Sequence, residues 1–425
     1  MTGFNEKNGI LHADDVPLPQ IAKAAGTPCY VYAASVIRQQ YERLAGAMAR
    51  AMPPGKQPLL CYACKANSNI AVLSLLRSLG CGLEIVSEGE LVRGLKAGFD
   101  AGKIVSTGVG KQKREIAACL KAGIHQFNVE SIPELEMIAA VASEIGKNAN
   151  VVFRLNPDVV GGGHHKISTG RKSDKFGMSV EVVQKAFAAA KTMKNVKALG
   201  LSMHIGSQVF TVESFREAFE KIPALVEGLR KAGHTVSRLD IGGGFPIVYR
   251  DEKLLDLDAY AQWVRDIIMP LDLEIIMEPG RYLVGGAGVL LTEVLYVKET
   301  QDRAFLIVDA AMNDLMRPAL YDAWHGIEPA QNRSAPATKQ YDVVGPICES
   351  SDIFAAQRPL PAMKQGDLAV IRTAGAYGFS MASNYNSRPL LAEVMVNGNT
   401  FDIIRKRQSY EDILRGEEIP GWLKK

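Results

Sequence analysis

The 425-residue sequence has no long hydrophobic run and no excess of charge of either sign. No window approaches the roughly 18 apolar residues that a membrane-spanning helix needs. The 49 basic residues are dispersed among 46 acidic ones, giving a net charge of +3, so bulk charge predicts no nucleic-acid and no membrane partner. Near the N-terminus no basic stretch precedes an apolar one, so we expect no secretory signal.

Cysteine is also sparse. Six cysteines in a chain of this length do not make a disulfide framework. Cys61 and Cys64 form a C-x-x-C pattern that could suggest zinc or redox chemistry, but no second Cys or His pair lies at zinc-finger spacing. Both cysteines fall in a predicted strand, where residues i and i+3 point to opposite faces of the sheet, so the two thiols would not face each other. We therefore expect packing cysteines, no metal site, a reducing compartment and a cytoplasmic protein.

What the sequence does contain is a repeated strand pattern. Short aliphatic runs alternate with amphipathic segments, which is typical of βα units with parallel strands. The runs are residues 58–65, 82–87, 103–108, 125–130, 149–156, 198–206, 237–244 and 273–281. Eight such units in about 250 residues predict a TIM-like (β/α)8 barrel, and a doubly wound sheet is the alternative.

Beyond about residue 285 the pattern changes. β-rich segments there are separated by turn residues without regular helices between them, which favours an antiparallel β domain. The N-terminal segment ends in PCYVYA, a strand that could join this domain. We predict an α/β plus β chain: residues 1–32 as an N-terminal strand of the β domain, 33–282 as the barrel and 283–425 as the C-terminal β domain.

Polar and glycine residues follow one end of every predicted barrel strand. They are Lys65, Ser87, Thr107, Asn128, Arg154, Asn156, His204, Gly242 to Gly244, Glu278 and Arg281. In a TIM barrel the catalytic groups lie at the C-terminal ends of the strands. Packing does not account for polar residues at one end of each apolar run, so we expect this rim to be functional.

Each of these rim motifs allows two or more interpretations. Lys65 could be a solvated charge, a partner of the cysteine pair, or a nucleophile whose pKa is lowered by desolvation. The glycines in DIGGGFP (240–246) could make a tight turn or bind a phosphate through their N–H groups. Glu278 and Arg281 could form a salt bridge, or could face a ring nitrogen and an anion separately. His204 could be structural or could stack on a planar cofactor.

In combination, and in this order along the chain, the motifs indicate a pyridoxal 5'-phosphate site. The chain resembles the fold-type III pyridoxal-phosphate decarboxylases, which have an alanine-racemase-like barrel and a β domain, and among them the diaminopimelate branch. The resemblance covers nearly the whole chain. It rests on YACKAN, IVSEGEL, HIGSQ, GGGF, EPGR, RPALYDAWH, GPICESSD and GAYGFSMASNYN, in the family's order.

The resemblance implies roles for the rim residues. Lys65 would be catalytic and would carry the cofactor, His204 would stack on its ring, and Glu278 would pair with its pyridine nitrogen and keep the ring protonated. The other cofactor-binding residues would be Ser207, Gly242, Gly243, Gly244, Pro279, Gly280, Arg281 and Tyr377.

The resemblance also implies a substrate site. Its residues would be Arg281, Arg317, Tyr321, Glu349 and Tyr377. The arginines would grip the distal carboxylate of a small amino-acid substrate, because a guanidinium bonds a carboxylate bidentately. Cys348 would be the catalytic proton donor. The family supplies the Cys348 loop from a second subunit, so a homodimer with shared active sites is implied.

The implied reaction is decarboxylation of meso-2,6-diaminopimelate to L-lysine and CO2, the last step of lysine biosynthesis. GGGFP instead resembles the ornithine branch, so a decarboxylase of ornithine, lysine or arginine is the alternative. The glutamate after Cys348, together with Arg317 and Tyr321, favours diaminopimelate. GPICESSD argues against a racemase, and the presence of Lys65, Cys348 and Glu278 argues against an inactive regulator.

Two features stay open at this level. Glu84 stands where the family often has aspartate. Residues 159–177 are glycine-rich and basic, and could form a mobile lid or simply a surface loop. The family's lid histidine would correspond to His164 or its neighbour His165.

Overall fold

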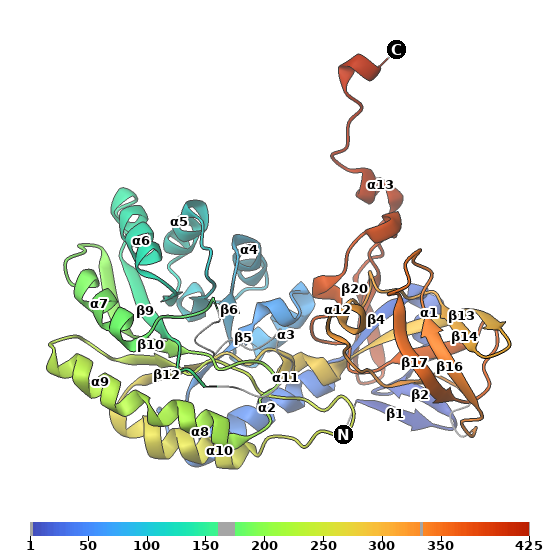
Figure 1. Ribbon diagram of the computed structural model, residues 1–425, viewed down its shortest axis with the longest axis horizontal. Coiled ribbons are helices and arrows are strands. Elements are labelled where there is room, and N and C mark those ends of the chain that lie inside the picture. The colour runs from blue at the N-terminus through green and yellow to red at the C-terminus, as the bar shows by residue number, and fades with distance from the viewer. Residues whose placement is uncertain (1–2, 160–174, 332–334, 425) are drawn as a thin grey trace. The chain divides into compact units, whose positions relative to one another are not determined.

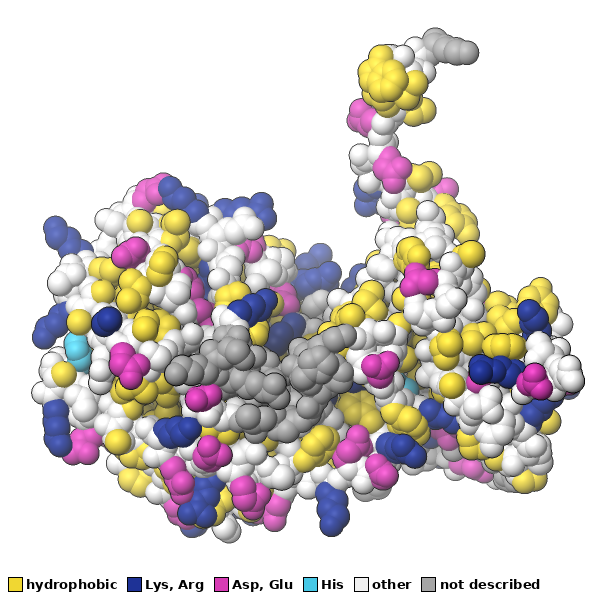
Figure 2. Space-filling model, viewed as in Figure 1, with side chains coloured by type: hydrophobic (Ala, Val, Ile, Leu, Met, Phe, Trp, Pro, Cys, Tyr) yellow, Lys and Arg dark blue, Asp and Glu magenta, His cyan; other side chains and the backbone are white. Residues whose placement is uncertain are grey.

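The computed structural model describes residues 3–159, 175–331 and 335–424, and these divide into two compact units. Residues 36–285 form one unit, and residues 1–35 with 286–425 form the other. Among the described residues no helix is long and apolar enough to cross a membrane. Figure 2 shows basic and acidic side chains interspersed on the face in view, as the balanced composition predicts.

The first unit is a closed barrel of eight parallel strands. The strands are β5 (Leu59–Ala63), β6 (Gly82–Ile85), β7 (Ile104–Ser106), β8 (Gln126–Val129), β9 (Ala149–Leu155), β10 (Val196–Met203), β11 (Arg238–Asp240) and β12 (Glu274–Met277). They pair in chain order, and β12 closes the barrel on β5. The predicted (β/α)8 barrel is therefore confirmed, and a doubly wound sheet is excluded.

Helices lie around these strands (Figure 1). They are α2 (Ala34–Ala51), α3 (Ile70–Ser78), α4 (Glu88–Lys96), α5 (Lys113–Ala122), α6 (Ile132–Glu144), α7 (Val180–Ala190), α8 (Val212–Glu220), α9 (Ile222–Lys231), α10 (Leu257–Trp263) and the short α11 (Arg281–Val284). Several begin where the sequence supplies a cap: the side chains of Asn69, Ser87 and Ser131 each accept a backbone N–H of the first turn. The three connections from β5 to α3, from β6 to α4 and from β8 to α6 are thereby fixed.

The second unit is built on a nine-stranded sheet. Its strands are β4 (Cys29–Ala33), β13 (Gly288–Glu299), β14 (Ala304–Val308), β15 (Ile327–Pro329), β16 (Lys339–Val344), β17 (Ile353–Leu360), β18 (Leu368–Ile371), β19 (Ala392–Asn397) and β20 (Thr400–Arg405). Most pairs are antiparallel, as predicted, but β14 with β16 and β19 with β4 are parallel. The sheet is mixed because these partners are far apart along the chain, where no hairpin dictates an antiparallel pair.

Smaller elements complete the second unit. They are the sheet β1 (Phe4–Lys7), β2 (Ile10–Ala13) and β3 (Val16–Pro17), and the helices α1 (Leu18–Ala25), α12 (Arg317–Tyr321) and α13 (Tyr410–Leu414). The predicted N-terminal strand is β4, which pairs with β13 and β19 in the middle of the large sheet. The three-stranded β1–β3 sheet before it was not predicted from the sequence.

Candidate active site

Lys65 lies in a one-turn 3-10 helix, Cys64–Ala66, directly after β5. Its Nζ donates to Glu84 Oε2 of β6 at 2.7 Å. The Glu84 side chain is fully buried, whereas 41% of the Lys65 side chain is exposed. The Lys65 side chain is therefore only partly buried in the single chain, and a buried carboxylate balances its charge.

The cysteine pair near Lys65 does not form a disulfide. Cys61 lies in β5 and Cys64 opens the following turn, and both are buried free thiols. Burial raises the pKa of both thiols, so they stay protonated at neutral pH. Cys61 packs with Val105 and Ile276 in the barrel core, as the packing interpretation predicts.

The three glycines after β11 bring their loop against the neighbouring strand ends. A Cβ at Gly242 would lie 2.4 Å from the Met203 carbonyl oxygen, and one at Gly243 would lie 2.2 Å from the Glu278 carbonyl oxygen. Gly242 and Gly244 also have positive φ angles, +68° and +100°, which disfavour a side chain. Close backbone approach therefore requires glycine here.

Two N–H groups of this loop have partners within the protein. Gly242 donates to Asp240 Oδ1 at 2.9 Å, and Gly243 donates to His204 Nδ1 at 3.1 Å. The loop thus holds a carboxylate and an imidazole in place. If these two N–H groups also bind a phosphate, their present hydrogen bonds must open or be shared.

His204 is at the end of β10, and its ring is fixed by that bond. Because Nδ1 accepts from Gly243, the neutral ring carries its proton on Nε2. Burial, followed by the positive charges of Arg154 and Lys65, lowers the pKa of His204 well below its usual range. The imidazole is therefore neutral at physiological pH, a flat and uncharged surface suited to stacking on a planar ring.

Glu278, just beyond β12, takes part in a buried hydrogen-bond network. Asn128 Nδ2 donates to Glu278 Oε1 at 3.1 Å and to Asp240 Oδ2 at 2.8 Å, and Thr107 Oγ1 donates to Glu278 Oε1 at 3.1 Å. Glu278 is 9% exposed and Asp240 is fully buried. Burial, and then the Asp240 charge, raises the pKa of Glu278 well above its usual range. Burial raises the pKa of Asp240 as well, so the pair retains a proton.

Arg281 is the first residue of α11 and is held by hydroxyl groups. Its Nη1 donates to Tyr249 OH at 2.8 Å, and its Nε and Nη2 donate to Ser207 Oγ at 3.3 and 3.2 Å. Glu278 bonds instead to Thr107 and Asn128, so the two motif residues have separate partners. Pro279 and Gly280 follow β12 and lie against the end of β5. Ala63 N donates to the Pro279 carbonyl oxygen at 3.1 Å, and a Cβ on Gly280 would approach Ala63 Cβ to 2.9 Å.

The remaining predicted residues lie in the β unit. Arg317 opens α12, is 7% exposed and donates from Nη1 to His325 Nε2 at 2.8 Å. Tyr321 ends the same helix and is half-buried, as is Tyr377, which has a positive φ of 56° after β18. Such a conformation is strained for a tyrosine and is typical of functional positions.

Cys348 and Glu349 lie between β16 and β17, and both are exposed. The Cys348 backbone N–H donates to Asn386 Oδ1 at 3.2 Å. Glu349 accepts hydrogen bonds from Ser351 Oγ and Tyr385 OH, which lower the pKa of its carboxyl group. Glu349 is therefore ionised at neutral pH, as recognition of an ammonium group requires.

Residues 160–174 of the predicted lid, including His164 and His165, lie outside the described residues. The described residues beyond them are held to the barrel rim. Gly177 N donates to Glu130 Oε2 at 2.8 Å, and Glu130 Oε1 accepts from Arg154 Nη1 at 2.6 Å. The Glu130–Arg154 ion pair therefore holds Gly177 in place at the rim.

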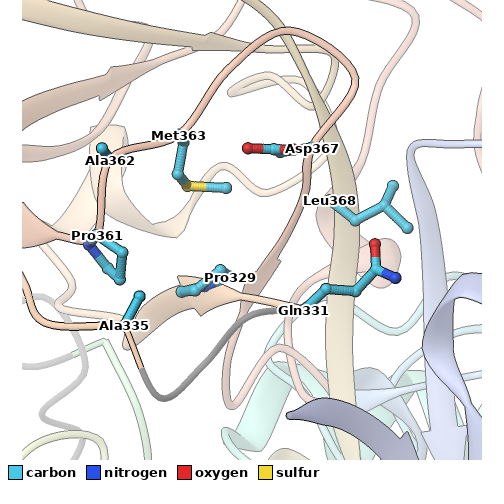
Figure 3. Close-up of a pocket in the computed structure, with 8 residues that line it drawn as sticks. All are labelled: Pro329, Gln331, Ala335, Pro361, Ala362, Met363, Asp367 and Leu368. Carbon is cyan, nitrogen blue, oxygen red and sulfur yellow. The ribbon is translucent and has the colours of Figure 1, made fainter.

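Two residues in these networks were missed from the sequence, Asp240 and Tyr249. Asp240 is the last residue of β11, and its position at a strand end, two residues before the first of the three glycines, could have identified it as a site residue from the sequence. Tyr249 follows the same loop with no motif around it. By contrast, a small cavity of about 40 Å³ between Pro329 and Met363 (Figure 3) offers no comparable chemistry. Its one carboxylate, Asp367, accepts from Lys364 N in a turn.

A closed parallel barrel with a lysine, a neutral imidazole, a glycine loop and a proton-holding carboxyl at its strand ends defines a fold-type III pyridoxal-phosphate enzyme. The donor set fits that cofactor. Lys65 offers an amine, His204 a flat surface, and Glu278 a buried carboxyl for a ring nitrogen.

Comparison with known proteins agrees with this class. Residues 36–285 match the family described as the pyridoxal-binding domain of pyridoxal-dependent decarboxylases. Diaminopimelate decarboxylase of Zymomonas mobilis is 45% identical over 100% of both chains. The structure of diaminopimelate decarboxylase from Helicobacter pylori complexed with L-lysine is 40% identical, covers 94% of this chain and 98% of its own, and has a TM-score of 0.89.

The enzyme from M. jannaschii, in complex with L-lysine, is 37% identical over 100% of both chains, with a TM-score of 0.93. The chain therefore belongs to the pyridoxal-dependent decarboxylases and, within them, to the diaminopimelate decarboxylase family.

Proposed function

We propose that this chain decarboxylates meso-2,6-diaminopimelate to L-lysine and CO2 with pyridoxal 5'-phosphate as its cofactor. The observation that carries the proposal is the similarity, over the full length of both chains, to diaminopimelate decarboxylases such as that of Zymomonas mobilis. Two of the similar solved structures contain L-lysine, which is the product of the proposed reaction.

The barrel residues would bind the cofactor, which when bound supplies an electron sink for the pair left by departing CO2. Lys65 would hold it covalently, and His204 would cover one face of its ring. Glu278 would face the ring nitrogen and keep it protonated, so that the ring can accept electrons. The cofactor site would be completed by Ser207, Gly242, Gly243, Gly244, Pro279, Gly280, Arg281 and Tyr377.

The β-unit residues, together with Arg281 of the barrel, would bind the substrate. Arg281, Arg317 and Tyr321 would bind the distal carboxylate, Tyr377 would contact the substrate and the cofactor phosphate, and the ionised Glu349 would bind the distal ammonium. Cys348 would deliver its Sγ proton to the carbon that has lost CO2. Both Cys348 and Glu349 are exposed in the single chain, which supports a homodimer in which this loop serves the partner's site. We place this dimer in the cytoplasm, and we propose residues 1–32, 33–282 and 283–425 as its functional divisions.

The test is CO2 release from cofactor-loaded protein given meso-diaminopimelate, the L,L isomer, L-lysine, L-ornithine or L-arginine separately. Turnover of the meso isomer alone, with L-lysine as product, is expected. Turnover of ornithine or lysine in its place would overturn the substrate assignment and the roles of Arg317 and Glu349, while leaving the role of Lys65 intact.

A further inference from the structure

A fully buried histidine, His325, is hydrogen-bonded to Arg317, the arginine proposed to bind the distal carboxylate of the substrate. His325 lies between α12 and β15, two residues before β15 begins. Its side chain is 0% exposed, and Arg317 is 7% exposed. Arg317 Nη1 lies 2.8 Å from His325 Nε2, and His325 Nδ1 lies 2.7 Å from the Arg372 carbonyl oxygen. Neither the reaction nor the motifs assign a role to this imidazole.

The two contacts fix the protonation state of the ring. A guanidinium has only donors and keeps its charge at all relevant pH values, so His325 Nε2 must accept from Arg317. A backbone carbonyl oxygen only accepts, so His325 Nδ1 must donate to Arg372 O. His325 is therefore neutral, with its proton on Nδ1.

The backbone around the ring is also held. Arg358 Nη1 donates to the carbonyl oxygen of His325 at 2.9 Å, and its guanidinium lies over the Trp324 ring at 4.7 Å. Arg372, which accepts from His325, forms an ion pair with Glu328. The imidazole therefore has a fixed place from which to orient Arg317.

The choice of a neutral partner has a chemical consequence. A carboxylate in place of His325 would orient the guanidinium equally well, but it would neutralise the charge and compete with a substrate carboxylate. A neutral imidazole takes one N–H and leaves the positive charge in place. The arrangement suits an arginine that must bind an anion.

We propose that His325 is a positioning residue for substrate specificity: by accepting one N–H of Arg317 it sets the direction in which the guanidinium meets the distal carboxylate. This inference rests on the proposed function, in which Arg317 binds that carboxylate. His325 itself touches neither substrate nor cofactor in this scheme.

Two matched substitutions separate the two bonds of the ring. In His325→Asn the amide N–H replaces Nδ1 and keeps the bond to Arg372, but the shorter side chain no longer reaches Arg317. In His325→Gln the side chain is longer, and its amide oxygen replaces Nε2 as the acceptor for Arg317. Both remove the ring, so loss of packing is shared between them and only the acceptor differs.

Binding is measured by calorimetry on the cofactor-loaded enzyme with two probes. L-Lysine, the proposed product, keeps the carboxylate that Arg317 would bind, and 1,5-diaminopentane is the same chain without it. His325→Asn is expected to weaken L-lysine binding on the order of ten- to a hundredfold, with diaminopentane changed less than about twofold. His325→Gln should bind L-lysine within about threefold of wild type.

Unchanged L-lysine binding in His325→Asn would overturn the inference. So would an equal loss for both probes, because that pattern reports a structural role only. If His325→Asn does not fold, His325→Gln decides: retained L-lysine binding supports the role of the acceptor, and its loss overturns it. Arg317→Met tests the underlying function separately. If that variant binds both probes as wild type does, the carboxylate role of Arg317 is wrong, whatever the His325 variants do.

Discussion

The candidate residues of the barrel and those of the β unit are held in different ways. In the barrel, the carboxyl groups of Glu84, Asp240 and Glu278 are buried, and the charge of Glu84 contributes to raising the pKa of both Asp240 and Glu278. In the β unit, Cys348 and Glu349 lie on an exposed segment between two strands. Arg317 is intermediate, since it is buried but held by a neutral partner.

Because of this difference, substitutions in the two regions should affect activity and folding stability to different extents. A change to one buried barrel charge leaves its neighbours uncompensated, so it should alter stability as well as activity. A change on the exposed segment should alter activity alone, because little of the folded state depends on it. The predictions below test that separation.

The largest effect is expected for Lys65→Met. Removing the only proposed covalent link to the cofactor should lower activity by about a thousandfold or more. It should also lower the free energy of unfolding by about 1–2 kcal/mol, reduced from the value for a fully buried pair because Lys65 is partly exposed. Steady-state rates, urea unfolding, and mass spectrometry after borohydride reduction measure these outcomes.

The control for Lys65→Met is the double variant Lys65→Met/Glu84→Gln. It removes the buried charge that the single variant leaves without its lysine. Stability should return toward that of wild type while activity stays lost. If the single variant is as stable as wild type, the Lys65–Glu84 pair does not contribute to folding and the contrast with the β unit fails.

The next effect is expected for Cys348→Ala. Loss of a positioned proton donor should lower kcat by about 10²- to 10⁴-fold. The unfolding free energy should change by less than about 0.5 kcal/mol, because the side chain is exposed. Cys119→Ala, which removes a buried thiol on α5, is the matched control and should show the opposite pattern. A normal rate for Cys348→Ala would rule out its catalytic role.

Much of the fold could be predicted from the sequence, because parallel barrel strands are buried on both faces and read as continuous apolar runs. Seven of the eight predicted runs contain the observed barrel strand, and the remaining run, 198–206, overlaps β10 but begins two residues after β10 does. The β unit was harder to predict. The partnership of β4 with β19 joins the two ends of the chain, and no local pattern specifies such a pair.

In the candidate site, too, contacts between residues far apart in the sequence could not be predicted. Residue types at strand ends indicated where Lys65, His204 and Glu278 would lie. Their partners depend on the register between strands, so the bonds of Asp240 to Gly242 and Asn128 could not be predicted. The partial exposure of Lys65 could not be predicted either, since the depth of a strand end in the rim is a property of the closed barrel. The roles of these residues remain predictions.

The smallest effect is expected for Glu278→Gln, measured on the cofactor-free protein by urea unfolding at pH 5 and pH 8. The folded pKa of Glu278 lies well above its ordinary value of 4.5, chiefly because of burial. Asp240, Glu84 and Lys65 are the charged groups that face it, and they belong to the same network. As the pH rises above about 4.5, the unfolded chain releases this proton while the folded chain retains it, so the unfolding free energy of wild type should fall.

Glu278→Gln has no such proton, so its stability should fall less between pH 5 and pH 8. At pH 8 it should exceed wild type by about 1–2 kcal/mol. Glu136→Gln on the exposed side of α6 is the control and should follow wild type at both pH values. If wild type and Glu278→Gln lose stability in parallel, Glu278 does not hold the proton. The carboxyl at the barrel rim would then resemble the exposed Glu349 in its ionisation, and burial would not be what distinguishes the two regions.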